Sequence, residues 1–186
     1  MDTAERLLGV AEELLSERGP DGVTVREVAR RAGLTPMAVY RHFDGVDALR
    51  DALRARGYQG LAAAFHDVLA EPDARSRLEA SARRYTRWAL DHPAMFRLMF
   101  TGGPAPEVAA TQVQHRRDAA AFRFLVDRIR EAMDAGVVPR GDPEARAIDW
   151  WALCHGLAVL QQEGKLRLPP DRFDAHLDST LQWLLR

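Results

Sequence analysis

The sequence predicts an all-α protein of about nine helices, with a three-helix head at residues 1–46 and a larger helical body at residues 47–186. Two observations support this fold class. Apolar residues recur at three- and four-residue spacing through most of the chain, and helix start and stop residues divide it into segments of helical length. No segment shows the strict alternation of apolar and polar residues that indicates a half-buried strand.

The composition is that of a folded globular chain. Of 186 residues, 47% are hydrophobic and 28% are charged, with a formal net charge of −1. No apolar run approaches the ~20 residues that span a bilayer. The first residues lack the basic start and apolar core of a signal peptide. A single cysteine, Cys154, excludes an internal disulfide. We therefore expect a cytoplasmic protein without membrane segments.

The first two helices of the head are indicated by their ends and their apolar faces. Residues 2–18 form an amphipathic pattern, which the turn cluster at 19–22 ends. Thr24 can N-cap a second helix, and Glu27 completes a capping box. Gly33 ends this helix, because glycine adopts the left-handed conformation without steric cost. Its apolar face consists of Val25, Val28, Ala29 and Ala32.

A third, short helix follows after a tight turn. Thr35 caps it and Pro36 opens it, while Val39 and Phe43 hold it against the preceding helix. Residues 24–43 therefore predict a helix-turn-helix, whose second helix has the size to enter a DNA major groove. The alternative is a helical hairpin inside an ordinary bundle. The remaining faces of this helix carry Pro36, Met37, Ala38, Tyr40, Arg41 and His42.

Charge favours a phosphate partner for this hairpin. Residues 24–43 hold four arginines against Glu27, a local balance of +3. Residues 1–58 as a whole are slightly acidic, but the other acids lie outside the hairpin. We expect double-stranded DNA to be the partner, with modest affinity and a strong salt dependence.

The run from Gly22 to Phe43, Gly-Val-Thr-Val-Arg-Glu-Val-Ala-Arg-Arg-Ala-Gly-Leu-Thr-Pro-Met-Ala-Val-Tyr-Arg-His-Phe, resembles the signature of TetR-type one-component regulators. The resemblance implies base contacts by Arg26, Pro36, Met37, Ala38 and Arg41, and phosphate contacts by Thr24, Tyr40 and His42. Thr35, the cap of the second hairpin helix, is also among the predicted DNA-binding residues. One position departs from the pattern, because the family usually carries a lysine where this chain has Val46.

The body is expected to contain six helices, at about 45–70, 74–91, 94–100, 107–135, 143–163 and 170–186, with a loop at 101–106. Two glycines, Gly57 and Gly60, interrupt the first of them. They either permit close packing or soften the helix that joins head to body.

The last two helices are candidates for a homodimer interface. One recognition helix reads only a few base pairs, and a two-fold dimer supplies the second half-site. The alternative is that both apolar stripes complete the core of the monomer. The run Trp150-Trp-Ala-Leu-Cys-His-Gly156 also resembles the Trp-x-x-x-His-Gly pattern of one C-terminal subclass of the family. The predicted interface residues are Ala152, Gly156, Val159, Phe173, Leu177, Thr180 and Leu184.

A cluster rich in aromatic and sulfur-bearing side chains indicates either a ligand cavity or a core that uses methionine as filler. The family resemblance favours a cavity for a small-molecule effector. Few charges lie nearby, so the effector is expected to be hydrophobic and uncharged or weakly anionic. The candidate ligand-binding residues are Trp88, Met95, Phe96, Met99, Phe100, Phe122, Trp151, Cys154 and His155.

Enzymatic chemistry is not expected. Cys154 and His155 are neighbours on a helix, diverge by about 100°, and cannot form a nucleophile–base pair. The other histidines lack metal-ligand spacing, and no glycine-rich phosphate loop occurs, so no metal or cofactor is predicted. The sequence predicts a ligand-controlled repressor that binds a near-palindromic operator. The alternatives are a protein-binding helical module and a helical enzyme.

Overall fold

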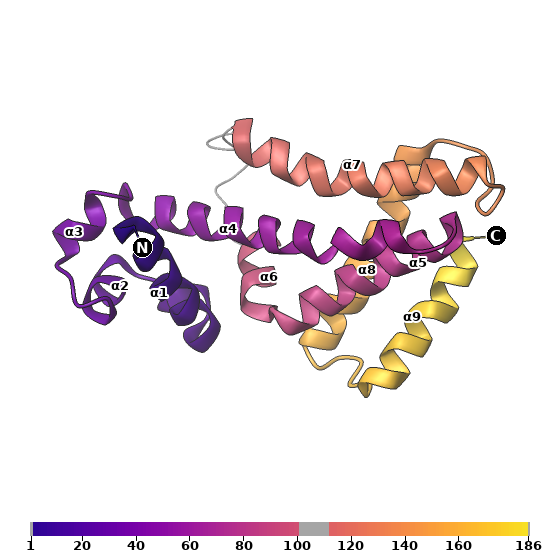
Figure 1. Ribbon diagram of the computed structural model, residues 1–186. Helices are drawn as coiled ribbons and strands as arrows, with labels where there is room; N and C mark the ends of the chain where they lie inside the picture. The colour runs from indigo at the N-terminus through magenta and orange to yellow at the C-terminus, as the bar shows by residue number, and fades with distance from the viewer. Residues whose placement is uncertain (1, 101–111, 186) are drawn as a thin grey trace. The chain divides into compact units, whose positions relative to one another are not determined.

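The computed structural model describes residues 2–100 and 112–185, with the side chains of 112–120 excepted, and all regular elements in these ranges are helical (Figure 1). The chain divides into two compact units, Met1–Gly60 with His92–Gln114, and Leu61–Asp91 with His115–Arg186. The predicted loop at 101–106 and the start of the predicted helix at 107 lie outside the described residues. No helix in the described part of the chain is long and apolar enough to cross a membrane.

The first unit contains the three-helix head. Helix α1 (Thr3–Arg18) is followed by a short 3-10 turn η1 (Pro20–Gly22), α2 (Val25–Arg31) and α3 (Pro36–Tyr40). The beginning of α4 (Gly45–Ala64) and the short helix α6 (Pro93–Phe100) complete the unit. Its core is formed by apolar side chains at helical spacing, including Leu7, Leu14, Val28, Val39, Leu49 and Leu53, which have no exposed surface.

Helix α6 is part of this unit because it packs against α1 and α4. Gly57 allows the close approach, since a Cβ atom there would lie 2.6 Å from Met99 Sδ. Arg54 donates from Nε to the carbonyl oxygen of Leu98 at 3.0 Å, near the C-terminal end of α6. These contacts support the close-packing interpretation of Gly57. The first compact unit is therefore larger than the predicted head of residues 1–46. The division of the chain into a DNA-binding head and a body at residue 46 stays a prediction.

The expected helix at 45–70 is wrong at its C-terminal end. Helix α4 ends at Ala64, and a separate 3-10 segment, η2 (His66–Ala70), follows it. Phe65 lies at the junction with φ −90° and ψ 0° and stacks on Phe124 with ring centroids 5.2 Å apart. The sequence did not reveal this break, because Val68 of η2 is also buried and the apolar periodicity therefore continues beyond Ala64.

The second unit contains η2, α5 (Ala74–Asp91), α7 (Gln112–Asp134), α8 (Pro143–Gln162) and α9 (Pro170–Leu184). Helix α5 contacts both α8 and α9, and α8 contacts α9. Asp142 caps the start of α8, because its Oδ1 accepts from Glu144 N at 2.9 Å. The largest fully buried side chains of this unit are Leu78, Ile129, Trp150, Phe173 and Leu177.

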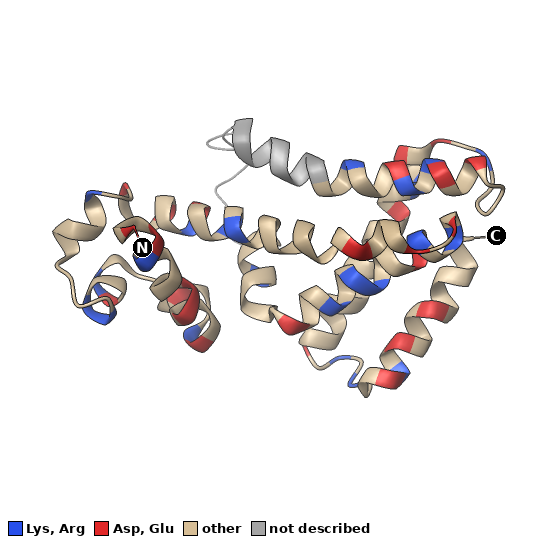
Figure 2. Cartoon of the chain, in the orientation of Figure 1, with Lys and Arg blue, Asp and Glu red and all other residues tan. Residues whose placement is uncertain are grey.

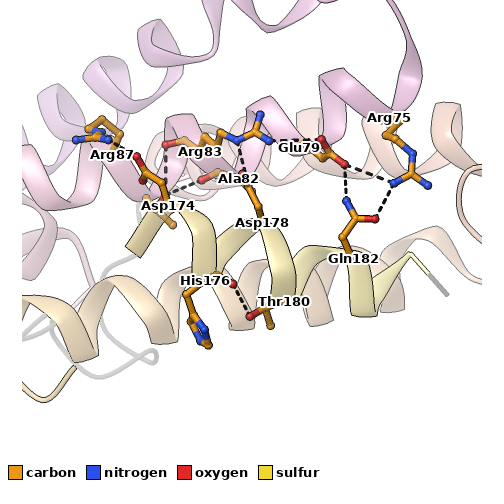
Figure 3. A network of polar contacts seen from close by, with 11 residues as sticks. Arg75, Glu79, Ala82, Arg83, Arg87, Asp174, His176, Asp178, Thr180 and Gln182 are labelled. Atoms are coloured by element: carbon orange, nitrogen blue, oxygen red, sulfur yellow. Dashed lines mark hydrogen bonds and ion pairs between the residues drawn. The ribbon is translucent and has the colours of Figure 1, made fainter. Parts of the chain in front are cut away.

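A row of polar side chains joins α5 to α9 at the edge of this core (Figure 3). Arg83 Nε lies 2.9 Å from Asp178 Oδ1, and Arg87 Nη2 lies 2.8 Å from Asp174 Oδ2. Gln182 extends the row by hydrogen bonding to α5. The buried apolar face of α9 and this polar edge together fix which side of the helix is turned towards α5.

Candidate nucleic-acid interface

The helix-turn-helix is built by local capping. Thr24 Oγ1 accepts from Glu27 N at 3.2 Å, and Thr35 Oγ1 accepts from Ala38 N at 3.3 Å. Gly33 lies between the helices with φ +66°, a conformation that glycine adopts without strain. Val28 and Val39 are fully buried where α2 meets α3. Both predicted N-caps and the glycine stop are therefore confirmed.

The Glu27 side chain has a different role from the expected one. Instead of completing a capping box, its carboxylate pairs with Arg30 Nη2 at 2.5 Å and Arg18 Nη1 at 2.9 Å. The hydrogen bond from Arg30, supported by the charge of Arg18, lowers the pKa of Glu27 to about 2. This carboxylate is therefore ionised at neutral pH and offsets cationic charge at the end of α2.

Long-range ion pairs reduce the positive charge that was expected on the hairpin. Arg31 pairs with Glu17 of α1 at 2.5 Å, so Arg30 and Arg31 both have carboxylate partners. Arg26 and Arg41 are exposed and form no salt bridge within the described residues. The sequence balance of +3 therefore overstates the free charge, which is concentrated on these two arginines.

The predicted DNA-binding residues are gathered on the surface of one head. All are exposed except Ala38, which is half-buried: Thr24, Arg26, Thr35, Pro36, Met37, Ala38, Tyr40, Arg41 and His42. Helix α3 carries no charged residue and is tan in Figure 2. Met37 and Tyr40 are 65% and 54% exposed, although they are large and apolar or aromatic. An uncharged helix with such side chains suits apolar contact with base edges and thymine methyl groups.

A surface depression of about 380 Å³ lies beside this helix, within the first unit. Sequence reasoning included Thr24, Arg26 and Tyr40 in the DNA-binding set and singled out Val46, but missed Arg50. The signal for Arg50 was its spacing, because it lies one helical turn after Val46 on α4. The lining consists of Val23, Thr24, Val25, Arg26, Tyr40, Val46 and Arg50.

The predicted ligand-binding residues fall in different compact units. Met95, Phe96, Met99 and Phe100 belong to the first unit, where the two methionines lie against Gly57 and Phe96 is 1% exposed. Met95, Phe96 and Met99 are buried there, whereas Phe100 is half-buried. The second unit contains the remaining members, Trp88, Phe122, Trp151, Cys154 and His155.

Within the second unit, a polar chain joins Trp151, Tyr85 and His155. Trp151 Nε1 donates to the Tyr85 hydroxyl oxygen at 2.9 Å, because an indole N–H can only donate. The Tyr85 hydroxyl oxygen also lies 2.9 Å from His155 Nδ1, and the tautomer of the imidazole decides which of the two groups donates. Burial lowers the pKa of His155, because desolvation disfavours the charged imidazolium. The candidate ligand-binding residues drawn from the sequence did not include Tyr85, so this contact was missed.

Cys154 carries no reactive thiol. It is 2% exposed, and burial raises its pKa to about 12, so the nucleophilic thiolate is absent at neutral pH. Within the described residues, no group of three or more histidine, cysteine, aspartate or glutamate side chains is placed to hold a metal ion.

Two residues of the predicted dimer interface lie in the core of the single chain. Phe173 and Leu177 are 2% and 0% exposed there. Docking of α9 on α5 and α8 buries this stripe, as the alternative interpretation held. Ala152 is exposed, and Gly156, Val159, Thr180 and Leu184 are half-buried. Large exposed apolar side chains on the same two helices were missed, namely Ile148, Leu160 and Trp183.

Comparison with known proteins assigns both parts of the chain to one family. Residues 7–53 match the model of bacterial regulatory proteins of the tetR family, and residues 78–184 match a tetracyclin repressor-like C-terminal domain. An uncharacterised HTH-type transcriptional regulator of Mycobacterium tuberculosis is 32% identical over 93 residues, 50% of this chain and 46% of that protein. The chain thus spans about half the length of curated relatives such as this one.

Solved structures share the fold over nearly the whole chain. A protein of unknown function from Rhodococcus sp. RHA1 has a TM-score of 0.88 at 31% identity, covering 100% of this chain and 95% of that one. AibR, solved with isovaleryl coenzyme A and operator DNA, has a TM-score of 0.71 at 17% identity, covering 95% and 96%. Two family models over separate parts of the sequence, together with a fold match of this extent, lead to one conclusion: the chain belongs to the TetR family of bacterial helix-turn-helix transcriptional regulators.

Proposed function

We propose that the chain is a ligand-responsive transcriptional repressor, which binds a near-palindromic operator as a homodimer and is released by a small hydrophobic effector. The observation that carries the proposal is the surface of the head. Arg26 and Arg41 are free of carboxylate partners within the described residues, and they flank an uncharged α3 with exposed Met37 and Tyr40. Because a repressor binds chromosomal DNA, the proposal places the protein in the bacterial cytoplasm.

The head residues divide into two roles in this proposal. Arg26, Pro36, Met37, Ala38 and Arg41 face base edges, where guanidinium groups can bind guanine O6 and N7. Thr24, Tyr40 and His42 bind phosphates, which position the head without reading sequence. Thr35 holds α3 by its cap at 3.3 Å from Ala38 N.

Dimerisation is proposed through the exposed faces of α8 and α9. Ile148, Ala152, Gly156 and Val159 follow one another at three- and four-residue spacing on α8, and Trp183 of α9 is 80% exposed. A two-fold arrangement of such faces would form a four-helix interface, with Leu160, Thr180 and Leu184 at its edges. This choice of residues replaces Phe173 and Leu177.

The effector site is proposed within the second unit, around Trp88, Phe122, Trp151 and His155. The Trp151–Tyr85–His155 chain offers polar groups among aromatic rings, and the ring centroids of Phe122 and Trp151 lie 6.1 Å apart. An effector lowers operator affinity only by its differential affinity for the two conformations. A protein of the same fold, AibR, was solved with both a small ligand and operator DNA.

Selection of binding sites from random DNA tests the proposal. We expect enrichment of sequences with two related half-sites about one helical turn apart, because two copies of α3 read successive major grooves. A matched selection with an Arg26→Ala, Arg41→Ala double variant should lose this enrichment. If the parent protein enriches no sequence and retards no duplex in a gel shift, the chain is a protein-binding module and the proposal is wrong.

A further inference from the structure

The surface depression on the head is lined by cationic and hydroxyl groups and by no acid. Arg26 and Arg50 contribute guanidinium groups, Thr24 and Tyr40 contribute hydroxyls, and valines form the rest of the lining. Thr24 Oγ1 accepts from Glu27 N, so its hydroxyl hydrogen remains able to donate outwards. Two positive charges and two hydroxyl donors around one hollow suit an anion with several acceptor oxygens.

Arg50 differs from the other arginines of α4 in its partners. Arg54 donates to Leu98 O at 3.0 Å and pairs with Asp51 at 2.6 Å, while Arg56 pairs with Glu5 and Glu12 of α1. Their charges are therefore used inside the protein. The charge of Arg50 has no such close carboxylate partner within the described residues.

The contacts of Arg50 orient it and leave donors unused. Nη2 donates to the carbonyl oxygen of Pro20 at 3.1 Å, which fixes the guanidinium against η1. Nη1 lies 3.9 Å from Asp47 Oδ1, beyond hydrogen-bond range, and the Asp47 side chain is 90% exposed. Nε is buried and has no hydrogen-bond partner in the described part of the chain. A guanidinium group has five N–H donors, and among the described residues only one of these is satisfied.

We infer that Arg50 contacts a DNA phosphate and supplies, from one turn further along α4, the positive charge that Val46 does not provide. Val46 and Arg50 line the same depression as Thr24 and Tyr40. The positively charged side chain therefore lies one turn further along α4 than in the family pattern, on the surface that carries the other proposed phosphate contacts. The inference rests on the proposed DNA binding and adds a residue that the family pattern does not predict.

The expected ligand is a backbone phosphodiester rather than a base. Arg50 is only 26% exposed in its side chain and is anchored to Pro20, so it cannot extend as a long exposed arginine does towards a groove floor. An oxygen-rich anion that enters the depression can meet Arg50 and both hydroxyls there. Contacts of this kind strengthen binding to all sequences alike.

The test compares Arg50→Gln with Arg140→Gln, an equal charge change at an exposed residue of the second unit. The probe is a mixed-sequence DNA duplex several helical turns long, followed by fluorescence anisotropy over a range of salt concentrations. The slope of log affinity against log salt should fall in magnitude by ~0.9 for each Arg50 lost, or ~1.8 for a dimer, and stay unchanged in Arg140→Gln. Arg50→Lys should retain the parent slope.

A second set of variants separates loss of a phosphate contact from loss of structure. Val46→Lys added to Arg50→Gln should restore the slope, because it returns one cation to the same depression. If Arg50→Gln unfolds, Arg50→Met, which removes the charge but keeps an unbranched apolar stem, replaces it in both comparisons. An Arg50→Gln slope equal to that of the parent, or a double variant that binds as weakly as Arg50→Gln, would overturn the inference.

Two further outcomes distinguish failure of the proposed function from failure of this inference alone. A parent protein that binds no duplex contradicts the proposed function as well as this inference. If inorganic phosphate raises the melting temperature of the parent but not of Arg50→Gln, while both bind DNA with the same salt slope, the depression binds a free anion and the assignment to DNA is wrong.

Discussion

Arginines on the helix-turn-helix differ in how much charge they can offer a ligand. Arg30 and Arg31 form close pairs with Glu27 and Glu17, and these contacts lower the pKa of both carboxyl groups. A phosphate that approached either arginine would compete with an ionised carboxylate already in contact. Arg26 and Arg41 meet no such competition within the described residues, so single substitutions there should affect DNA binding most strongly.

Arg41→Ala should weaken binding to the preferred operator by about 1–3 kcal/mol and relax the base preference at one position. The reason is that Arg41 follows directly after α3, is exposed, and can bind a guanine edge with two hydrogen bonds. Anisotropy titrations against the operator and its single-base variants measure both effects. Arg30→Ala is the matched control, with a smaller loss expected. An equal loss on all sequences would identify Arg41 as a phosphate contact.

His155 should make the stability of the fold depend on pH. Burial lowers the pKa of His155 in the folded chain below the value of about 6.5 expected when unfolded. Between these two values the unfolded chain binds a proton that the folded chain does not, so stability rises with pH in this window. The stabilisation is present above about pH 6.5 and is lost as the pH falls through the window.

His155→Asn should flatten this dependence, because the amide can donate to or accept from the Tyr85 hydroxyl but does not titrate. Urea midpoints at about pH 7.5 and about pH 5.5 measure the difference. The control is His176→Asn, at an exposed residue of α9, which should retain the parent behaviour. If His155→Asn and the parent lose the same stability on acidification, other groups cause the dependence.

Helix α4 shows how one small residue decides the packing of an element. A Cβ atom added at Gly57 would meet Met95 and Met99 of α6, whereas one added at Gly9 in α1 would have no neighbour within 4 Å. Both glycines lie inside helices, so the intrinsic gain from alanine is the same and the difference between them reports packing alone.

Gly9→Ala should stabilise the protein by about 0.5–1 kcal/mol, since it adds helix propensity without a clash. Gly57→Ala should gain less, because the Met99 thioether must move from 2.6 Å. Gly57→Leu should destabilise by about 1–3 kcal/mol through overpacking. Chemical denaturation of the three variants gives these values. Equal gains at the two glycines would mean that α6 does not pack closely on α4.

Assembly is the property of the whole molecule that single residues can test most cleanly. A Cβ atom at Gly156 meets nothing within 4 Å in the single chain, so a larger side chain is compatible with the fold. The same side chain would separate two copies if the exposed face of α8 forms their contact.

Gly156→Leu should therefore shift the protein from dimer to monomer in sedimentation velocity, with an unchanged circular dichroism spectrum. Gly9→Leu adds the same side chain at another open helical glycine and should leave the dimer intact. Loss of operator affinity should accompany loss of the dimer, because half-sites are then bound separately. A Gly156→Leu protein that remains dimeric would place the interface elsewhere.

The sequence alone determined the identity and limits of most helices. The caps of Thr24 and Thr35 and the stop at Gly33 were all predicted, because each depends on hydrogen bonds or backbone angles within about four residues. The run from Gly22 to Phe43 also indicated the family, since its apolar, capping and turn positions lie in one continuous stretch.

Tertiary structure decided which side chains remain available. Arg31 meets Glu17 across 14 residues, and Arg83 meets Asp178 across 95, so neither neutralisation is visible in local charge counts. The same holds for α9, where an apolar stripe looks identical whether it faces its own chain or a second copy. The docking of α9 on α5 and α8 buried Phe173 and Leu177. Periodicity specifies that a face is apolar, but the partner that covers it is fixed by packing between segments distant in the sequence.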